Sequence, residues 1–159
     1  MIGSPTELTK LQSDRLESQS GVDLITVDDP ASDVSQLLSR LRASAEVGKT
    51  VIGIRTTSRD GSAPDPLHAS QMLALIIDLA VECADSMQLD GIYASGGDVA
   101  FAVLDALGAR GYEVANEVVP LAVSGKLVGG PHDGLGFATK GGLVGDADAA
   151  VECINQLRS

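Results

Sequence analysis

The stretch GIYASGGDVAFAVLDALG, residues 91–108, is the part of the chain that sets the fold class. It opens with the apolar segment Gly91–Ser95, which predicts a strand buried on both faces. Two glycines and an aspartate follow, and the apolar run Val99–Leu107 then predicts a buried helix capped by Gly108. A buried strand joined to a buried helix by a short turn is the repeating unit of an α/β fold.

The same alternation continues toward the N-terminus. Strands are predicted at Val22–Val27 and Thr50–Thr57, and a long, well-buried helix at Leu67–Met87. Two more helices are indicated by apolar stripes at helical spacing. The stripes consist of Leu8, Leu11 and Leu16 in the first helix and of Val34, Leu37, Leu38 and Leu41 in the second.

Beyond Gly108 the pattern changes to short strands within Glu113–Val128 and Leu135–Thr139, and a last helix at about Asp146–Leu157. The sequence therefore predicts a three-layer α/β sandwich with a mostly parallel sheet and helices on both faces. A length of 159 residues predicts a single domain, residues 1–159. Met1 and Ile2 look like the stump of a first strand, so we expect a piece of a larger protein.

Composition excludes some partners. A net charge of −11 argues against nucleic acid, because binding to its backbone requires a basic surface. The longest apolar stretch, Met72–Val81, is interrupted by Asp78 and is far shorter than the ~20 residues that span a bilayer, so no membrane association is expected. No signal peptide is recognisable. We expect Cys83 and Cys153 to be buried thiols in the cytoplasm, although one disulfide is the alternative.

Three junctions before helices could bind a ligand, since helix N-termini at the carboxyl ends of strands attract anions. In the first, Ser4 precedes Pro5 and Glu7, which is also the pattern of a simple capping box. In the second, Gly96 and Gly97 precede Asp98, which could be a plain N-cap or could lie near a nucleotide-bound Mg²⁺.

The third junction is the segment Thr139–Asp146, in which Lys140 and three glycines precede the last helix. Its composition suits phosphate, and a flexible connection with a solvated lysine is the alternative. Common nucleotide fingerprints are missing, because Gly48-Lys49-Thr50 follows a helix and the glycine pattern from Gly134 breaks at Thr139. The histidines have no partners at zinc-ligand spacing, and no catalytic residues can be assigned.

Taken in order, these motifs resemble the C-terminal, nucleotide-binding domain of the four-carbon acid sugar kinases. The resemblance covers nearly the whole chain. It is carried by Gly3-Ser4 with Thr9 and Gln12, by Ser95–Asp98 with the following Ala102–Val114, by Glu117–Pro120 with Gly125, and by Thr139-Lys140 with Gly142, Gly145 and Asp146. The chain departs from the family pattern at Val99, Val144 and Leu121, where Thr, Phe and Gly respectively are common.

The resemblance implies a domain that binds ATP with Mg²⁺ and takes part in phosphorylating a sugar acid such as erythronate, threonate or an oxo-tetronate. It assigns nucleotide contacts to Ser4, Gly96, Gly97, Asp98, Val99 and Gly142, with Gly141 adjacent. The acidic motif that holds the sugar acid in the family's N-terminal domain is absent from this sequence. The alternative is a non-catalytic nucleotide-binding or assembly module that docks with a separate substrate domain, and a homo-oligomer is compatible with either.

Overall fold

The computed structural model describes residues 1–3, 6–57 and 65–158, so the predicted site residue Ser4 lies outside the described residues. The described helices are α1 (Glu7–Glu17), α2 (Val34–Glu46), α3 (Pro66–Ser86), α4 (Gly97–Ala106) and α5 (Ala149–Leu157). The strands are β1 (Val22–Val27), β2 (Val51–Thr56), β3 (Gly91–Ser95), β4 (Gly111–Val119), β5 (Ala122–Val128) and β6 (Gly136–Lys140).

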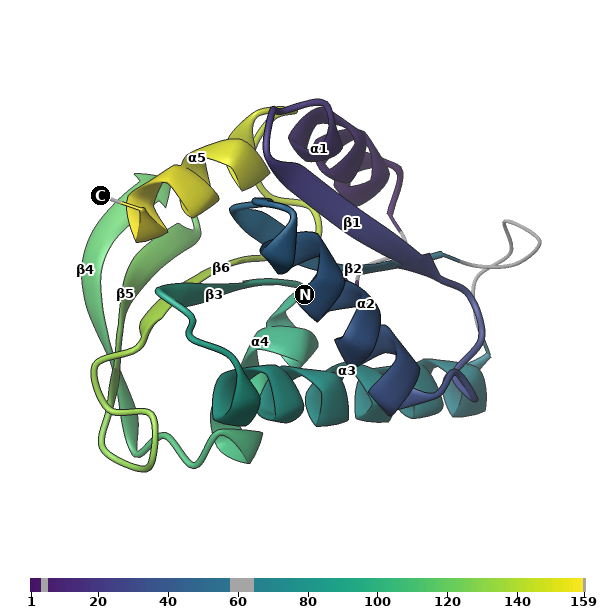
Figure 1. The fold of residues 1–159 in the computed structure, drawn as a ribbon. Coiled ribbons are helices and arrows are strands. Elements are labelled where there is room, and N and C mark those ends of the chain that lie inside the picture. Colours follow the sequence, from purple (N-terminus) through teal and green to yellow (C-terminus); the bar gives the residue numbers. More distant parts are fainter. Residues whose placement is uncertain (4–5, 58–64, 159) are drawn as a thin grey trace.

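The strands form a mixed sheet in two parts, β1-β2 and β3-β6-β5-β4. β1 pairs with β2 and β3 with β6 in parallel, whereas β5 is antiparallel to both β6 and β4. Ile2 joins the two parts, because it makes parallel bridges to Arg55 on one side and to Ser95 on the other. The N-terminal residues therefore lie in the middle of the molecule (Figure 1).

Helices cover both faces of the sheet, which confirms the predicted α/β sandwich (Figure 1). α2, α3 and α4 cover one face over a large core that includes Leu41, Ile76 and Phe137. α1 and α5 lie together on the other face, where Leu16 and Cys153 belong to a smaller core. The two cores meet at the strands, whose side chains alternate between them.

The predicted strands Val22–Val27 and Gly91–Ser95 are confirmed, and β2 begins one residue later than predicted. The segment after α4 forms an antiparallel hairpin, in which Leu121 adopts a φ of 66°. Left-handed backbone favours glycine, and Leu121 is the only other residue type with a positive φ in the described part of the chain.

The predicted apolar stripe of the first helix is only partly right, since Leu16 is buried and Leu8 half-buried but Leu11 is not. Leu11 of α1 is 53% exposed, while Thr9, Gln12, Ser13 and Leu16 form the buried face. Three of these four residues are polar, so apolar periodicity in the sequence does not indicate this buried face. Polar side chains are buried only where they find partners, and the partners of Thr9 and Gln12 lie in the candidate site described below.

α3 is long and apolar enough to span a membrane by length and composition. Packing inside the protein accounts for the apolar composition of α3. The helix contacts α2 and α4 and contributes Ile76, Leu79 and Ala80 to the larger core. One side of the helix is nevertheless exposed, so the prediction of a well-buried helix is only partly right. Both cysteines are free and buried, and burial raises the pKa of each thiol to about 11.

Candidate functional site

A pocket of about 670 Å³ opens at the carboxyl ends of the parallel strands, where α3 and α4 begin. Its lining brings together described residues from all three predicted junctions: Gly3 and Thr6 before α1, the turn from Gly96 to Val99, and the segment from Gly141 to Val144. Each predicted site residue in the described part of the chain therefore lies at this pocket. Their contact with a nucleotide stays a prediction.

The N-terminus of α4 forms one wall of the pocket. Gly96 is the N-cap residue, with a φ of 108°, and no side chain in the described part of the chain caps this end of the helix. The N–H groups of the first helical residues, Gly97, Asp98 and Val99, have no acceptor within the helix because the helix begins there. These donors, together with the positive end of the helix dipole, suit an anionic ligand.

Asp98 is therefore not the N-cap, which was one of the two predicted roles for it. It lies in the first turn of α4, where a carboxylate is favoured by the helix dipole, and its side chain is exposed. Asp98 and His68 are the only ionisable side chains among the described residues that line the pocket. Among the described lining residues, an anion would therefore meet backbone N–H groups rather than Lys or Arg.

Neither the backbone conformation nor the packing of the described residues requires a glycine at position 97. Its φ is not positive, and an added Cβ would meet no atom within 4 Å among the residues that the structure describes. Alanine would be better than glycine in a helix by roughly 0.5–1 kcal/mol. Gly97 is exposed and lines the pocket, so the space beside its backbone is open to a ligand.

At Gly3 and Gly141, in contrast to Gly97, tight packing against a neighbouring side chain explains why the residue is glycine. A Cβ on Gly3 would lie 2.6 Å from Cγ2 of Val99, and one on Gly141 would lie 3.0 Å from Cγ2 of Val144. Val99 and Val144 thus pack directly against two of the glycines that line the pocket.

The carbonyl of Gly142 is fixed to the start of α1 by two hydroxyl groups. Thr6 Oγ1 donates to Gly142 O at 2.9 Å, and Thr9 Oγ1 donates to the same oxygen at 3.0 Å. Thr6 also caps α1, since its Oγ1 accepts from the Thr9 N–H at 3.1 Å. The cap of α1 and the third glycine turn are therefore one connected structure.

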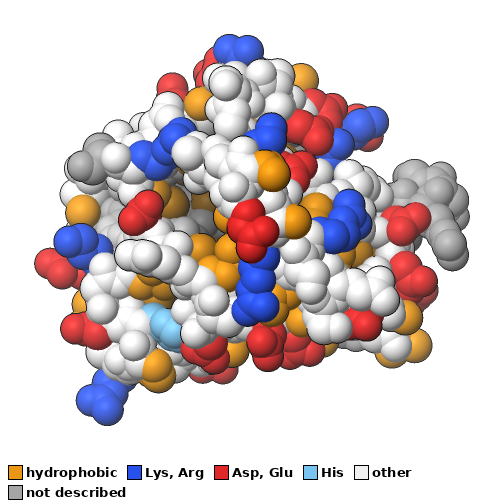
Figure 2. Space-filling view, viewed as in Figure 1, with side chains coloured by type: hydrophobic (Ala, Val, Ile, Leu, Met, Phe, Trp, Pro, Cys, Tyr) orange, Lys and Arg blue, Asp and Glu red, His pale blue; other side chains and the backbone are white. Residues whose placement is uncertain are grey.

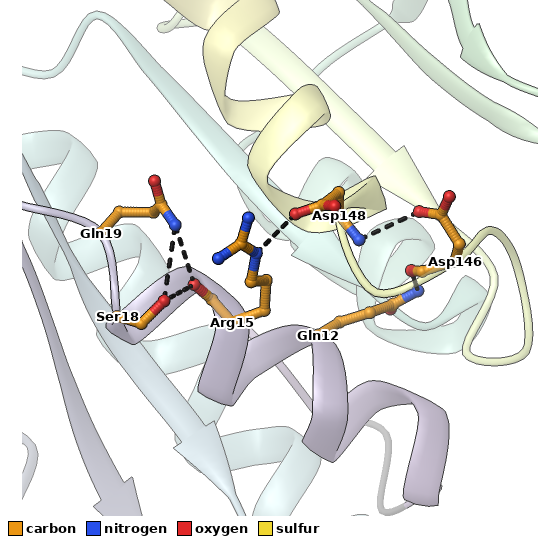
Figure 3. Close-up of polar contacts among 6 residues, drawn as sticks. All are labelled: Gln12, Arg15, Ser18, Gln19, Asp146 and Asp148. Atoms are coloured by element: carbon orange, nitrogen blue, oxygen red, sulfur yellow. Dashed lines mark hydrogen bonds and ion pairs between the residues drawn. The ribbon is translucent and has the colours of Figure 1, made fainter.

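Gln12 continues this connection one helical turn further along α1 (Figure 3). Its Nε2 donates to the carbonyls of Val144 at 3.0 Å and Asp146 at 2.6 Å, and its side chain is almost fully buried. Beyond it, an ion pair between Arg15 Nε and Asp148 Oδ1 at 2.6 Å joins α1 to the start of α5 on the surface. The sequence places Thr9 and Gln12 in a motif, but it does not indicate that their side chains bond α1 to the third glycine turn.

Lys140 does not line the pocket, contrary to the interpretation of a phosphate-binding lysine or a solvated one. It is only 2% exposed, on the sheet face that α5 covers, and its Nζ donates to the carbonyl of Gly141 at 2.9 Å. Burial lowers the pKa of this amine. The alternation of β6 turns Lys140 to the same face as Ala138 and away from the α4 side.

The opposite wall of the pocket comes from the start of α3 and the end of β2, which sequence reasoning missed. Thr56, Thr57, His68 and Ser70 supply polar atoms there. Apolar side chains complete the wall, namely Met72, Leu73, Ile76 and Leu143. The cap of α3 could have indicated this region, because Asp65 Oδ1 accepts from the N–H groups of Leu67 and His68.

No preformed metal centre is present in the described part of the chain, where no three His, Cys, Asp or Glu residues come together. The one carboxylate among the described lining residues, that of Asp98, is compatible with Mg²⁺. This ion keeps several waters and is commonly held by one or two carboxylates together with substrate phosphates.

A family model described as "Nucleotide-binding C-terminal domain" matches residues 1–150. A D-erythronate kinase from Heliobacterium modesticaldum is 37% identical over 183 aligned positions, which cover 99% of this chain and 40% of the kinase. A D-threonate kinase from Salmonella typhimurium is 38% identical over 76 positions, or 48% of this chain and 17% of that enzyme. The chain thus spans about two fifths of the erythronate kinase that it resembles.

Solved structures show the same fold. A domain of unknown function from Bordetella bronchiseptica, crystallised with citrate as a domain-swapped dimer, superimposes with a TM-score of 0.84 at 24% identity, over 99% of this chain and 40% of that one. A Haemophilus influenzae protein superimposes with a TM-score of 0.77 at 17% identity, over 98% and 39% of the two chains.

Proposed function

Because the chain belongs to the nucleotide-binding C-terminal domain family of the four-carbon acid sugar kinases, we propose that it binds ATP in the pocket at the start of α4. The observation that carries the proposal is the uncapped N-terminus of α4, with a glycine that the fold itself does not require. In this proposal, residues 1–159 act as one nucleotide-binding unit.

The phosphates would lie against the N–H groups of Gly97, Asp98 and Val99 and across from the turn at Gly141 and Gly142. Such backbone donors bind phosphate without a basic side chain, which fits the acidic composition and the lining of the pocket. Ser4 is included by resemblance alone; in the sequence it follows Gly3, which lines the pocket. Mg²⁺, when bound with the nucleotide, neutralises phosphate charge, and Asp98 is the residue that would hold it.

The adenine ring would take the apolar part of the pocket. Met72, Leu73 and Ile76 of α3 and the largely exposed Leu143 face this space. Nucleotide bases are commonly received by apolar walls, with a few polar groups that fix their orientation. Thr56 and Thr57 provide hydroxyl groups of that kind at the end of β2.

We further propose that this chain serves phosphorylation of a four-carbon sugar acid, as the names of its kinase relatives suggest. The groups that bind the sugar acid and remove the proton from its hydroxyl would come from a second domain, which corresponds to the remaining length of those relatives. The 159 residues alone should bind nucleotide and show little or no kinase turnover. We place this activity in the cytoplasm, where two free, buried thiols remain reduced.

Isothermal titration calorimetry with ATP and Mg²⁺ tests the proposal. Wild type should give saturable heat, and Gly97→Ala should weaken binding at least tenfold because its methyl group enters the space of the phosphates. Gly111→Ala is the matched control, since a Cβ at Gly111 meets only Cβ of Val128 at 3.7 Å, outside the pocket. Absence of heat at millimolar ATP, or equal affinity in both variants, would contradict it.

A further inference from the structure

The third glycine turn is a β-turn formed by residues 141–144, directly after β6. Val144 N–H closes it by donating to Gly141 O at 3.2 Å, and Gly142 and Leu143 lie at its centre. The whole turn borders the proposed nucleotide pocket, because each of its residues belongs to the lining. The direction in which its N–H groups point therefore decides which donors the pocket offers to a ligand on this side.

Both peptide units that flank Gly142 are fixed by side chains. Gly141 O accepts from Nζ of Lys140 at 2.9 Å. Gly142 O accepts from the hydroxyl groups of Thr6 and Thr9 at 2.9 and 3.0 Å. Glycine is otherwise the residue with the greatest backbone freedom, so these bonds give the turn one orientation before any ligand arrives.

The bond from Lys140 determines where the N–H of Gly142 points. A trans peptide unit is planar, so its C=O and the N–H of the next residue point in opposite directions. Gly141 O points to Lys140, which lies on the sheet face covered by α5. The N–H of Gly142 consequently points away from that face, toward the pocket, and it has no acceptor among the described residues.

This N–H group lies close to the start of α4. Gly96, the N-cap of α4, donates its N–H to Lys140 O at 3.0 Å, so the two turns are bonded to each other directly. Both turns line the same pocket. The free N–H groups of α4 and that of Gly142 thus come from adjoining segments, as in the backbone concavities that bind phosphate.

Lys140 also differs in its electrostatics from the basic residues of the surface. On the face drawn in Figure 2, Lys and Arg side chains are scattered among Asp and Glu side chains. Lys140 is buried, and no ion pair within the described part of the chain involves it. Its hydrogen bond polarises the peptide between Gly141 and Gly142, which makes the Gly142 N–H a stronger donor to an anion.

We propose that Lys140 is a positioning residue for the phosphates of the nucleotide, which it does not touch. It holds the Gly141 carbonyl on the α5 side of the sheet, so that the Gly142 N–H donates into the pocket. Thr6 and Thr9 fix the next peptide unit and keep the turn rigid. This role rests on the proposed binding of ATP and deepens it, because it predicts an effect confined to ligands that carry phosphate.

The test is Lys140→Met, which keeps an unbranched side chain of similar length in a buried position. Lys126→Met is the matched control, because it removes the same charge from an exposed side chain on β5, outside the pocket. Both are titrated with ATP and Mg²⁺, with tripolyphosphate and with adenosine, followed by amide NMR shifts, which measure affinity into the millimolar range.

Lys140→Met should bind ATP and tripolyphosphate about tenfold or more weakly than wild type, as expected for a lost hydrogen bond to a charged group, and adenosine within about twofold. Lys126→Met should match wild type. ATP should shift the Gly142 amide proton downfield in wild type and clearly less in Lys140→Met. A purely structural lysine would weaken adenosine as much as ATP, and that result would overturn the proposal. So would equal ATP affinity in the two variants, although the proposed function would then stand.

A second pair keeps the test decisive if Lys140→Met does not fold. Gly142→Pro removes the N–H itself and suits the second position of a β-turn, while Gly142→Ala retains the N–H. The proline variant should bind ATP about tenfold or more weakly than the alanine variant, with equal adenosine affinity. Equal ATP affinity would overturn the proposal.

The two phosphate ligands separate this role from the proposed function. A wild-type protein that binds tripolyphosphate but not ATP would contradict nucleotide binding alone, and the tripolyphosphate affinity of Lys140→Met would then decide the role of Lys140. A wild-type protein that binds neither would overturn both.

Discussion

Replacing Gln12 with methionine tests whether the buried polar face of α1 holds the third glycine turn in place. The substitution removes two hydrogen bonds, to Val144 O at 3.0 Å and to Asp146 O at 2.6 Å. It preserves the approximate volume of a side chain that is 1% exposed. Leaving a buried carbonyl without its donor costs about 1–3 kcal/mol. Both hydrogen bonds here are only part-buried, so we take the lower part of that range, about 3 kcal/mol for the two losses together.

Part of this cost is offset. Gln12 Oε1 is itself buried without a hydrogen-bond partner among the described residues, and methionine removes that unfavourable group. We therefore expect a net destabilisation of about 2 kcal/mol, which corresponds to a decrease of about 4–8 °C in melting temperature. Because the turn at Gly141 and Gly142 lines the pocket, we also expect ATP affinity to fall severalfold.

Thermal unfolding followed by circular dichroism measures the effect, with Gln19→Met as the matched control. Gln19 follows the same helix, and its Nε2 makes only long contacts, 3.3 Å to Arg15 O and 3.4 Å to Ser18 Oγ (Figure 3). It should change stability by less than ~0.5 kcal/mol, as is usual for surface positions. If Gln12→Met melts within 1–2 °C of Gln19→Met, where about 4–8 °C is expected, the holding role is refuted.

Leu121→Gly should stabilise the protein by about 1 kcal/mol in urea denaturation, because it relieves a left-handed leucine that is 78% exposed; Leu121→Ala, which keeps the strain, should not. A chain with Met1 as its free terminus should gain stability as pH rises from about 6 to 8, since burial lowers the pKa of that amine from 8.0 to about 6 and the unfolded state binds more protons in this range. The gain is at most about 2–3 kcal/mol. Urea denaturation at pH 6 and pH 8 measures it, and a stability that does not rise over this range would contradict the assignment.

Local patterns predicted the parallel part of the fold well. Gly91–Ser95 and Val22–Val27 are short apolar runs bounded by polar or turn residues, and their covered position follows from their lack of a polar face. Gly96, Gly97 and Asp98 lie at the pocket because turns that follow neighbouring parallel strands lie at one edge of the sheet.

The remaining features depend on contacts between distant residues. The buried face of α1 is polar because Thr9 and Gln12 bond to carbonyls more than 130 positions away, which no periodicity indicates. Lys140 is turned from the pocket by the register of β6, and one residue of shift would have reversed its face. His68 and the apolar wall of α3 reach the pocket only through the packing of α3 against α4.

The central claim is that the uncapped start of α4 binds the phosphates of a nucleotide. Titration of ATP and Mg²⁺ into Gly97→Ala, together with its melting temperature, tests that claim most directly. Alanine at this position meets no described atom and favours the helix. We therefore predict equal or higher stability, by up to about 1 kcal/mol, with at least tenfold weaker ATP binding. Unchanged affinity in a variant that remains stable would contradict the claim.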